Sequence, residues 1–349
     1  MIIGNHGINQ IGLPMERRVS GMIVGSNRFR YKVAEDWGQL PKGWRFHEVC
    51  GVAVDSQDRV YVFDRDREHP IVIFDRDGNF LDTWGNGIFN RPHSIRIGAD
   101  DSVYCVDTGD HTVRKFTNEG KLLMMLGNKN RPSDTGCNEL DYRAIKRGGP
   151  PFNRPTDLAF APSGEIFVSD GYGNARVHKF STDGTLLLSW GEAGSGPGEF
   201  AFPHSICVDK YGKIYVADRE NNRIQVFTLN GEFITEWTGV TRPDGLFIDV
   251  DDNLYVAELG YRYGLWPWMA PPGPGSPLPR LSVWNLKGEL LAHWGGEDSC
   301  APGNFCCPHM ICTDSRGDLY VSEVNFSGAG KRGLVPIDCH TLQKFVRTV

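Results

Sequence analysis

Three histidines recur at one place in a repeated sequence pattern. The chain contains 10 His, and the motif Pro-His-x-Ile occurs three times, with its histidines at His93, His204 and His309. A set of three neutral imidazoles with an open coordination position is typical of a catalytic Zn²⁺ site, and it also suits iron or manganese. We therefore expect these residues to bind one divalent metal, with zinc as the first choice. The alternative is that each His after Pro is a turn or packing residue.

Two arginines and a tyrosine occupy places from which they can act on a substrate beside such a metal. Arg65 and Arg219 each follow an acidic residue that ends a short apolar segment, and Tyr172 lies one place further along its own segment. Two guanidinium groups can clamp a carboxylate, and a tyrosine near a metal and an arginine can act as general base. The alternatives are surface ion pairs, such as Arg219 with Glu220, and a packing role for Tyr172.

The elements that must position these residues form a sixfold internal repeat. Each repeat begins with an alternating strand and continues through a polar turn into a second strand that ends in an acid. The repeats begin at residues 49, 92, 155, 203, 243 and 308. The six acids are Asp64, Asp107, Asp170, Asp218, Glu258 and Glu323. Because an acid is present in every repeat, we expect these side chains to stabilise turns and not to act in catalysis.

Four short antiparallel strands, repeated six times, predict an all-β fold, a six-bladed β-propeller. The last repeat lacks a fourth strand, so we expect residues 31–37 to supply it and close the ring. The predicted organisation is an N-terminal arm over 1–30 and a single propeller domain over 31–349. Long intervals between repeats indicate insertions near 128–153 and 260–279. On a rigid ring such loops either form the walls of a site or act as a passive cover.

The second place of each repeat start is occupied by Cys50, His93, Thr156, His204, Asp244 and His309. Alternate blades of a six-bladed ring are related by about 120°, so equivalent residues lie at one radius and one height. If this place faces the channel, the three imidazoles converge on the axis. The sixfold repeat therefore predicts that three histidines far apart in sequence form one metal site on the axis.

Composition excludes several other classes of protein. The 349 residues carry 37 Lys+Arg and 43 Asp+Glu, a formal charge of −6, which argues against binding of nucleic acid. The first residues show no secretory signal, and we find no segment apolar enough to enter a membrane. The 9 Cys lack paired metal-binding spacings, so we expect mostly buried free thiols and a cytoplasmic location.

The six units resemble NHL repeats. The metal motif, together with residues 169–172 and 216–221, resembles the peptidyl-α-hydroxyglycine α-amidating lyase family over about residues 49–348. This resemblance implies a catalytic zinc held by His93, His204 and His309, with Tyr172 as the catalytic residue. It also implies that Arg65 and Arg219 are the substrate-carboxylate and active-site arginines, with catalytic as well as substrate-binding roles.

Several residues of this sequence differ from those of the family at functional positions, and these differences change what the resemblance implies. Cys307 stands where the family has a methionine near its third histidine, and we expect Cys307 to contribute to substrate binding. Met310 replaces an aspartate that ligates structural calcium in the family, so a calcium site is not expected. The family's disulfide positions correspond to Asn153, Gly173, Tyr215 and Val226. Neither of its bridges can form, which favours a cytoplasmic form acting on a small molecule.

The sequence thus predicts a metal-dependent lyase that cleaves the C–N bond of a small anionic carbinolamide, N–CH(OH)–COO⁻. On the same site, a metal-dependent hydrolase of an ester, lactone or amide is the first alternative. The second alternative is a non-catalytic propeller that binds a protein partner. The oligomeric state is not predicted.

Overall fold

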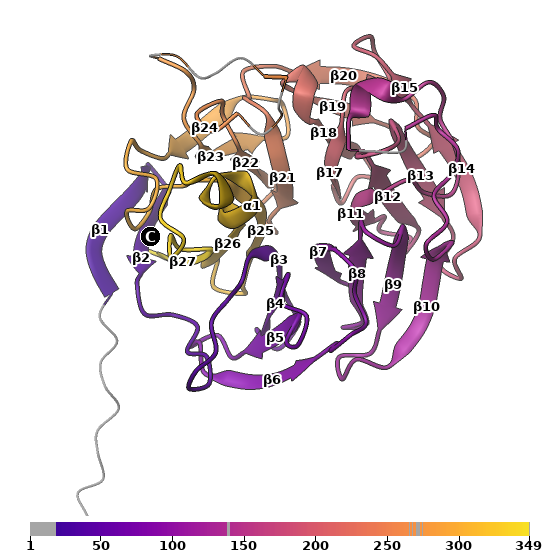
Figure 1. Ribbon diagram of the computed structural model, residues 1–349. Coiled ribbons are helices and arrows are strands. Elements are labelled where there is room, and N and C mark those ends of the chain that lie inside the picture. Colours follow the sequence, from indigo (N-terminus) through magenta and orange to yellow (C-terminus); the bar gives the residue numbers. More distant parts are fainter. Residues whose placement is uncertain are drawn as a thin grey trace, which may run out of the picture.

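The computed structural model describes residues 19–137, 140–264, 266, 268–269, 273 and 275–348. Its long strands form six sheets arranged as blades around a common axis (Figure 1). The predicted all-β, six-bladed propeller is confirmed. Within the described residues the helical elements are short, namely α1 (Asn325–Gly328), η1 (Tyr142–Ala144), η2 (Arg219–Asn221) and η3 (Gly330–Arg332). None of them is long and apolar enough to cross a membrane.

Five blades are four-stranded and follow the chain from the axis outwards. Blade one holds β3 (Val49–Val54), β4 (Val60–Asp64), β5 (Ile71–Phe74) and β6 (Phe80–Trp84). Blade two holds β7 (Pro92–Ile97), β8 (Val103–Asp107), β9 (Thr112–Phe116) and β10 (Leu122–Gly127). Blade three holds β11 (Pro155–Phe160), β12 (Ile166–Asp170), β13 (Arg176–Phe180) and β14 (Leu186–Trp190). The first strand of each blade begins where the sequence repeat predicted it.

Blades four and five follow the same order. Blade four holds β17 (Pro203–Val208), β18 (Ile214–Asp218), β19 (Arg223–Phe227) and β20 (Phe233–Trp237). Blade five holds β21 (Pro243–Ile248), β22 (Asn253–Glu258), β23 (Arg280–Asn285) and β24 (Leu290–Trp294). A short parallel pair, β15 (Glu192–Ala193) and β16 (Glu199–Phe200), joins blades three and four.

Blade six is closed by the N-terminal part of the chain. Its order from the axis is β25 (Pro308–Thr313), β26 (Leu319–Glu323), β27 (Leu342–Arg347), β2 (Phe29–Ala34) and β1 (Val19–Ser26). Strand β2 supplies the missing fourth strand, as the sequence predicted. The predicted arm over 1–30 is too long, however, because β1 pairs with β2 as a fifth strand. The sequence repeat has no counterpart of a fifth strand, and β1 was therefore assigned to the arm.

The core lies between the blades. The second strands are fully buried, as in β4 and β18, whereas outer strands such as β6 are partly exposed. The acid at the end of each second strand accepts backbone N–H bonds from the segment that leads into the first strand of its own blade. Asp107, for example, accepts from Asn90 and Arg91 at 2.7 and 2.9 Å. The predicted turn-stabilising role of these acids is therefore observed.

The cysteines follow the sequence expectation with one exception. Seven are free and buried. Cys300 and Cys339 instead form a disulfide, although 39 positions separate them in sequence. They lie on two connections, residues 295–307 and 324–341, that meet beside blade six. The sequence reasoning missed this bridge because neither connection belongs to the repeat.

Candidate metal centre and cavity

The three predicted histidines converge on the propeller axis. They lie at the second position of β7, β17 and β25, and all three are buried. One ring nitrogen from each lies within 4.8 Å of the others. The ring centroids are 4.7 to 5.0 Å apart. The arrangement predicted from alternate blades is therefore present.

The outward-facing nitrogen of each imidazole is held by the backbone of the next blade. The Nδ1 atoms of His93, His204 and His309 lie 2.6, 2.8 and 2.6 Å from the backbone oxygens of Thr156, Asp244 and Cys50. A carbonyl oxygen only accepts, so Nδ1 carries the proton and Nε2 keeps its lone pair. Such an outer contact is typical of metal-ligating histidines.

Three nitrogen lone pairs directed at one point suit a metal ion. The Nε2 of His204 is buried and has no hydrogen-bond partner among the described residues. Burial lowers the pKa of all three histidines well below the ordinary value, and the positive charges of Arg65 and Arg219 lower it further. The imidazoles are therefore neutral, which is the state that binds a metal. The residues fit a divalent ion.

Tyr172 lies beside this centre. Its hydroxyl oxygen is 3.2 Å from Nε2 of His93, and its ring contacts the ring of Phe202 edge-on. The close approach of blades three and four depends on Gly171, because a Cβ there would lie 2.2 Å from the backbone oxygen of Pro203. Tyr172 therefore reaches the centre from a tight junction, as its predicted role requires.

Arg65 reaches the same cavity from the end of β4. Its Nη1 donates to Glu48 at 2.5 Å and to Ser327 at 3.1 Å, and its Nε donates to the backbone oxygen of Pro92 at 3.2 Å. Burial raises the pKa of Glu48, but the charge of Arg65 and the hydrogen bonds from Ser327 and Arg65 together hold this pKa below its usual value. The pair is thus ionised, and Nη2 of Arg65 has no hydrogen-bond partner among the described residues.

Arg219 lies at the start of η2 and is almost fully buried. It donates to Glu220 and Asp244, both at 2.9 Å, and its guanidinium stacks 4.0 Å from the ring centroid of Phe202. Burial raises the pKa of Asp244 to about 6, and Arg219 opposes this. Burial also raises that of Glu220, but Arg219 and Arg242 lower it to about 2. Arg219 therefore keeps a fixed orientation, as a residue that binds a carboxylate must.

Cys307 lies away from the cavity wall. Its side chain belongs to an apolar cluster between blades six and one, and its Sγ is 3.8 Å from that of Cys306. The hydrogen bond to Cys306 and burial both raise the pKa of Cys307 well above the ordinary value. The thiol is protonated and packed among apolar side chains. Among the described residues no contact of Cys307 with the cavity is observed, and its contribution to substrate binding stays a prediction.

The cavity above the metal centre has a volume of about 510 Å³. Its wall includes Arg65, Tyr172, Arg219 and two of the histidines. Both predicted insertions contribute to it: Leu140 and Asp141 come from the first, and Trp266 and Trp268 from the second. The two tryptophan rings are stacked with centroids 5.1 Å apart. The insertions thus form walls, one of the two roles that the sequence left open.

A third segment of the wall was not predicted. The connection from β26 to β27 contributes Val324, Ser327, Gly328 and Lys331, through α1 and η3. Arg91, two residues before His93, also lines the cavity. Long intervals between repeat starts were the only signal used to locate insertions in the sequence, and the connection over 324–341 lies inside the last repeat, after which no further start follows.

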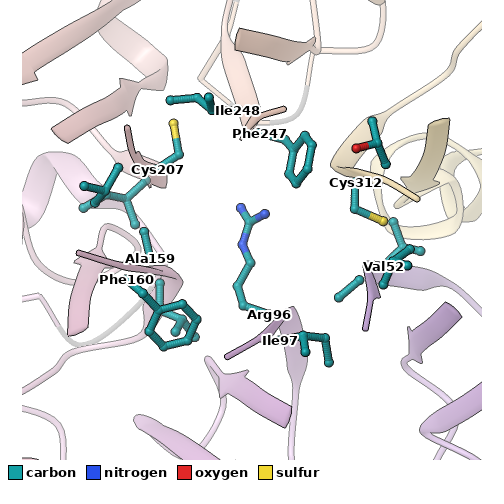
Figure 2. A pocket seen from close by; sticks show the side chains of 15 residues that line it. Val52, Arg96, Ile97, Ala159, Phe160, Cys207, Phe247, Ile248 and Cys312 are labelled. Carbon is teal, nitrogen blue, oxygen red and sulfur yellow. The ribbon is translucent and has the colours of Figure 1, made fainter. Parts of the chain in front are cut away.

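The opposite end of the axis is closed by an ion pair. Arg96 stands in the middle of the channel, surrounded by apolar side chains from the first strands (Figure 2). It donates to both carboxylate oxygens of Asp157, at 3.0 and 2.5 Å, and to the backbone oxygen of Leu246 at 3.0 Å. Access to the three histidines is therefore from the cavity side.

Comparison with known proteins agrees with this fold. A family model described as DUF5128, 6-bladed beta-propeller, matches residues 152–256. NHL repeat-containing protein 3 of Homo sapiens is 34% identical over 317 residues, which cover 86% of this chain and 83% of that protein. The chain belongs to the NHL-repeat family of β-propellers.

This NHL-repeat protein is also similar to a second relative and to a solved structure. Peptidyl-alpha-hydroxyglycine alpha-amidating lyase 1 of Drosophila melanogaster is 33% identical over 268 residues, covering 69% of this chain and 44% of that protein. The NHL-repeat chain thus spans less than half of that relative. The structure of a gluconolactonase from Xanthomonas campestris has a TM-score of 0.58 with 13% identity, covering 91% of this chain and 90% of the other. At this identity the likeness concerns the fold alone.

Proposed function

We propose that the protein is a metal-dependent lyase that cleaves the C–N bond of a small carbinolamide. The observation that carries this proposal is the convergence of three imidazoles, each held at Nδ1, beside the hydroxyl of Tyr172 in one cavity with Arg65 and Arg219. The relationship to a protein named as an amidating lyase supports it. In the proposed reaction, the substrate loses its hydroxyl proton, a C=O bond forms, and the C–N bond breaks as nitrogen gains a proton. The products are an amide and glyoxylate.

A divalent metal bound by His93, His204 and His309 lowers the pKa of a coordinated hydroxyl group. Zinc is our first choice, with iron or manganese as alternatives. Tyr172 lies where it can accept the proton that the substrate hydroxyl releases. Arg65 and Arg219 present Nη2 donors to the substrate carboxylate, and their acidic partners hold the two guanidinium groups in place.

Replacement of a histidine ligand tests this proposal. We expect His204→Ala to lose bound metal and to release no glyoxylate from N-acetyl-α-hydroxyglycine above background. Metal content is measured by mass spectrometry of the purified protein, and glyoxylate by a coupled assay. His293→Ala, an exposed histidine on β24, is the matched control and keeps both properties. Full metal content in His204→Ala would contradict the proposal.

The same assay separates the alternatives. Ester, lactone or simple amide hydrolysis without glyoxylate release would indicate the hydrolase. Protein that takes up no Zn²⁺, Mn²⁺ or Fe²⁺ would indicate a scaffold that binds a protein partner. The cytoplasmic location stays a prediction, and the Cys300–Cys339 disulfide weighs against the free-thiol reasoning behind it, because disulfides are rare in the cytosol.

A further inference from the structure

In each blade, the second residue of the first strand is the position that the three histidines occupy. The residue two places before it is charged in four of the six blades. From blade one to blade six its occupants are Glu48, Arg91, Arg154, Phe202, Arg242 and Cys307. Glu48 pairs with Arg65, and Arg242 pairs with Glu220. Arg91 differs from these two, since it lines the cavity and has no ion pair or side-chain hydrogen bond among the described residues.

The charges around the cavity are otherwise balanced. Arg219 is paired with both Glu220 and Asp244. The carboxylate of Asp141 is paired with Arg143. Lys331 also lines the cavity without an ion pair among the described residues. Two positive charges, on Arg91 and Lys331, therefore remain without an acidic partner in the wall, although the chain as a whole carries −6.

The structure holds Arg91 close to the reacting centre. Its backbone N–H donates to Asp107 at 2.9 Å, and its guanidinium lies 5.9 Å from the ring centroid of Tyr172. Arginine stays charged at all relevant pH values and needs hydrogen-bond acceptors for its donors. An unpaired guanidinium in the wall of a cavity thus indicates an anion supplied by the ligand.

We infer that the substrate carries a second anionic group, which Arg91 binds with help from Lys331. This inference rests on the proposed function, in which Arg65 and Arg219 bind the carboxylate next to the reacting carbon. The second group, a carboxylate or an anion of similar size, lies on the acyl part of the carbinolamide. The substrate class is therefore a dianionic N-acyl-α-hydroxyglycine. The cavity of about 510 Å³ has room for such an acyl chain.

Two ligands of matched shape test the inference by binding alone. N-succinylglycine carries two carboxylates, and N-succinamoylglycine replaces the distal carboxylate with a neutral amide. Both lack the hydroxyl group and cannot be cleaved. Titration calorimetry on the zinc-loaded protein gives the ratio of their affinities. We expect the dianion to bind about tenfold more tightly or better, as a charge-assisted hydrogen bond provides.

Variants assign this preference to Arg91. Arg91→Met should lower the preference for the dianion to about twofold or less, chiefly by weakening the binding of N-succinylglycine. Binding of N-succinamoylglycine to the variant then shows that the cavity is intact. Arg91→Lys should retain part of the preference. Arg262→Met, which removes a cation paired with Glu297 outside the cavity wall, should leave it unchanged. Equal affinities for both ligands in the wild type, or an unchanged preference in Arg91→Met/Lys331→Met, would overturn the inference.

The two proposals fail in different measurements. Absence of glyoxylate release from every N-acyl-α-hydroxyglycine contradicts the lyase function, whereas the affinity ratio of the unreactive ligands does not depend on turnover. Release of glyoxylate with equal affinities for the two ligands contradicts only the second anion site.

Discussion

The three histidines are anchored through backbone atoms of the intervening blades. Cys50, Thr156 and Asp244 each contribute a carbonyl oxygen to the Nδ1 of a neighbouring histidine. Since the contact common to all three uses the backbone, the side chains of these three residues need no common chemistry, and they have none. The sequence therefore showed the ligands but not the groups that orient them. Only the ring of blades, which places each carbonyl beside an imidazole, reveals this contact.

Asp244 adds a side-chain contact to this arrangement. Its Oδ1 lies 3.1 Å from Nδ1 of His204 and 2.9 Å from Nη1 of Arg219, so one carboxylate contacts both a proposed metal ligand and a proposed substrate-binding residue. We expect Asp244→Asn to weaken zinc binding about tenfold, because second contacts of ligating histidines contribute an effect of this size. Competition with a chromophoric chelator measures the affinity. Asp249→Asn, on the turn after β21, is the control, and equal zinc affinities in the two variants would contradict this role.

The acid at the end of each second strand holds the segment that leads into the first strand of the same blade. Glu323 in blade six accepts the backbone N–H of Cys306 and a side-chain hydrogen bond from Gln343. The same contact recurs in every blade, and the histidines of alternate blades bring ring nitrogens within 4.8 Å of one another. The acid present in all six blades is therefore structural, whereas the catalytic roles that we propose fall on residues present in single blades.

In blade six the acid at the end of the second strand also forms an ion pair, which makes the free energy of unfolding depend on pH. Nε2 of His340 lies 2.9 Å from Glu323. Burial lowers the pKa of His340, but Glu323 outweighs burial and raises the pKa above its ordinary value. The stabilisation is therefore complete below the unfolded pKa of about 6.5 and is lost as the pH rises through the folded pKa.

We expect His340→Gln to be less stable than the wild type by about 1 kcal/mol at pH 5.5, because the variant removes the positive charge that pairs with the buried carboxylate of Glu323. At pH 9 the difference should be much smaller. Urea unfolding at both pH values measures it, with exposed His293→Gln as a control that shows no such dependence. A stability difference that grows with pH would contradict the assigned direction of the shift.

At the scale of the whole molecule, the repeat predicted the ring and the residues that converge on its axis. It could not predict parts that occur once. The connection over 324–341 forms a wall of the cavity and carries one half of the Cys300–Cys339 disulfide. Blade five has a connection of similar length between its second and third strands, but blades one to four do not. Strand β1 was missed for the same reason. The role that we propose for Arg91 depends on its place in the cavity wall and its lack of an ion pair among the described residues, and only the arrangement in space shows these two features.

Side chains on the propeller axis also connect the blades to one another. Arg96 of blade two contacts Asp157 of blade three, the backbone of Leu246 in blade five, and Sδ of Met310 in blade six at 3.9 Å. Asp157 has a fully buried side chain and also accepts from Ser205 of blade four at 2.6 Å. One buried ion pair therefore links five blades.

Arg96→Met should destabilise the protein by about 3–5 kcal/mol, because it leaves the carboxylate of Asp157 buried without its charge partner. Arg96→Met/Asp157→Asn should recover most of this loss, since the double variant buries no unpaired charge. The matched control is Arg59→Met, whose pair with Asp55 is 26% exposed on the arginine side and should contribute less than about 1 kcal/mol. Chemical unfolding of all four proteins measures these differences. If the double variant is as unstable as Arg96→Met, the loss comes from packing around the axis and not from the unpaired charge.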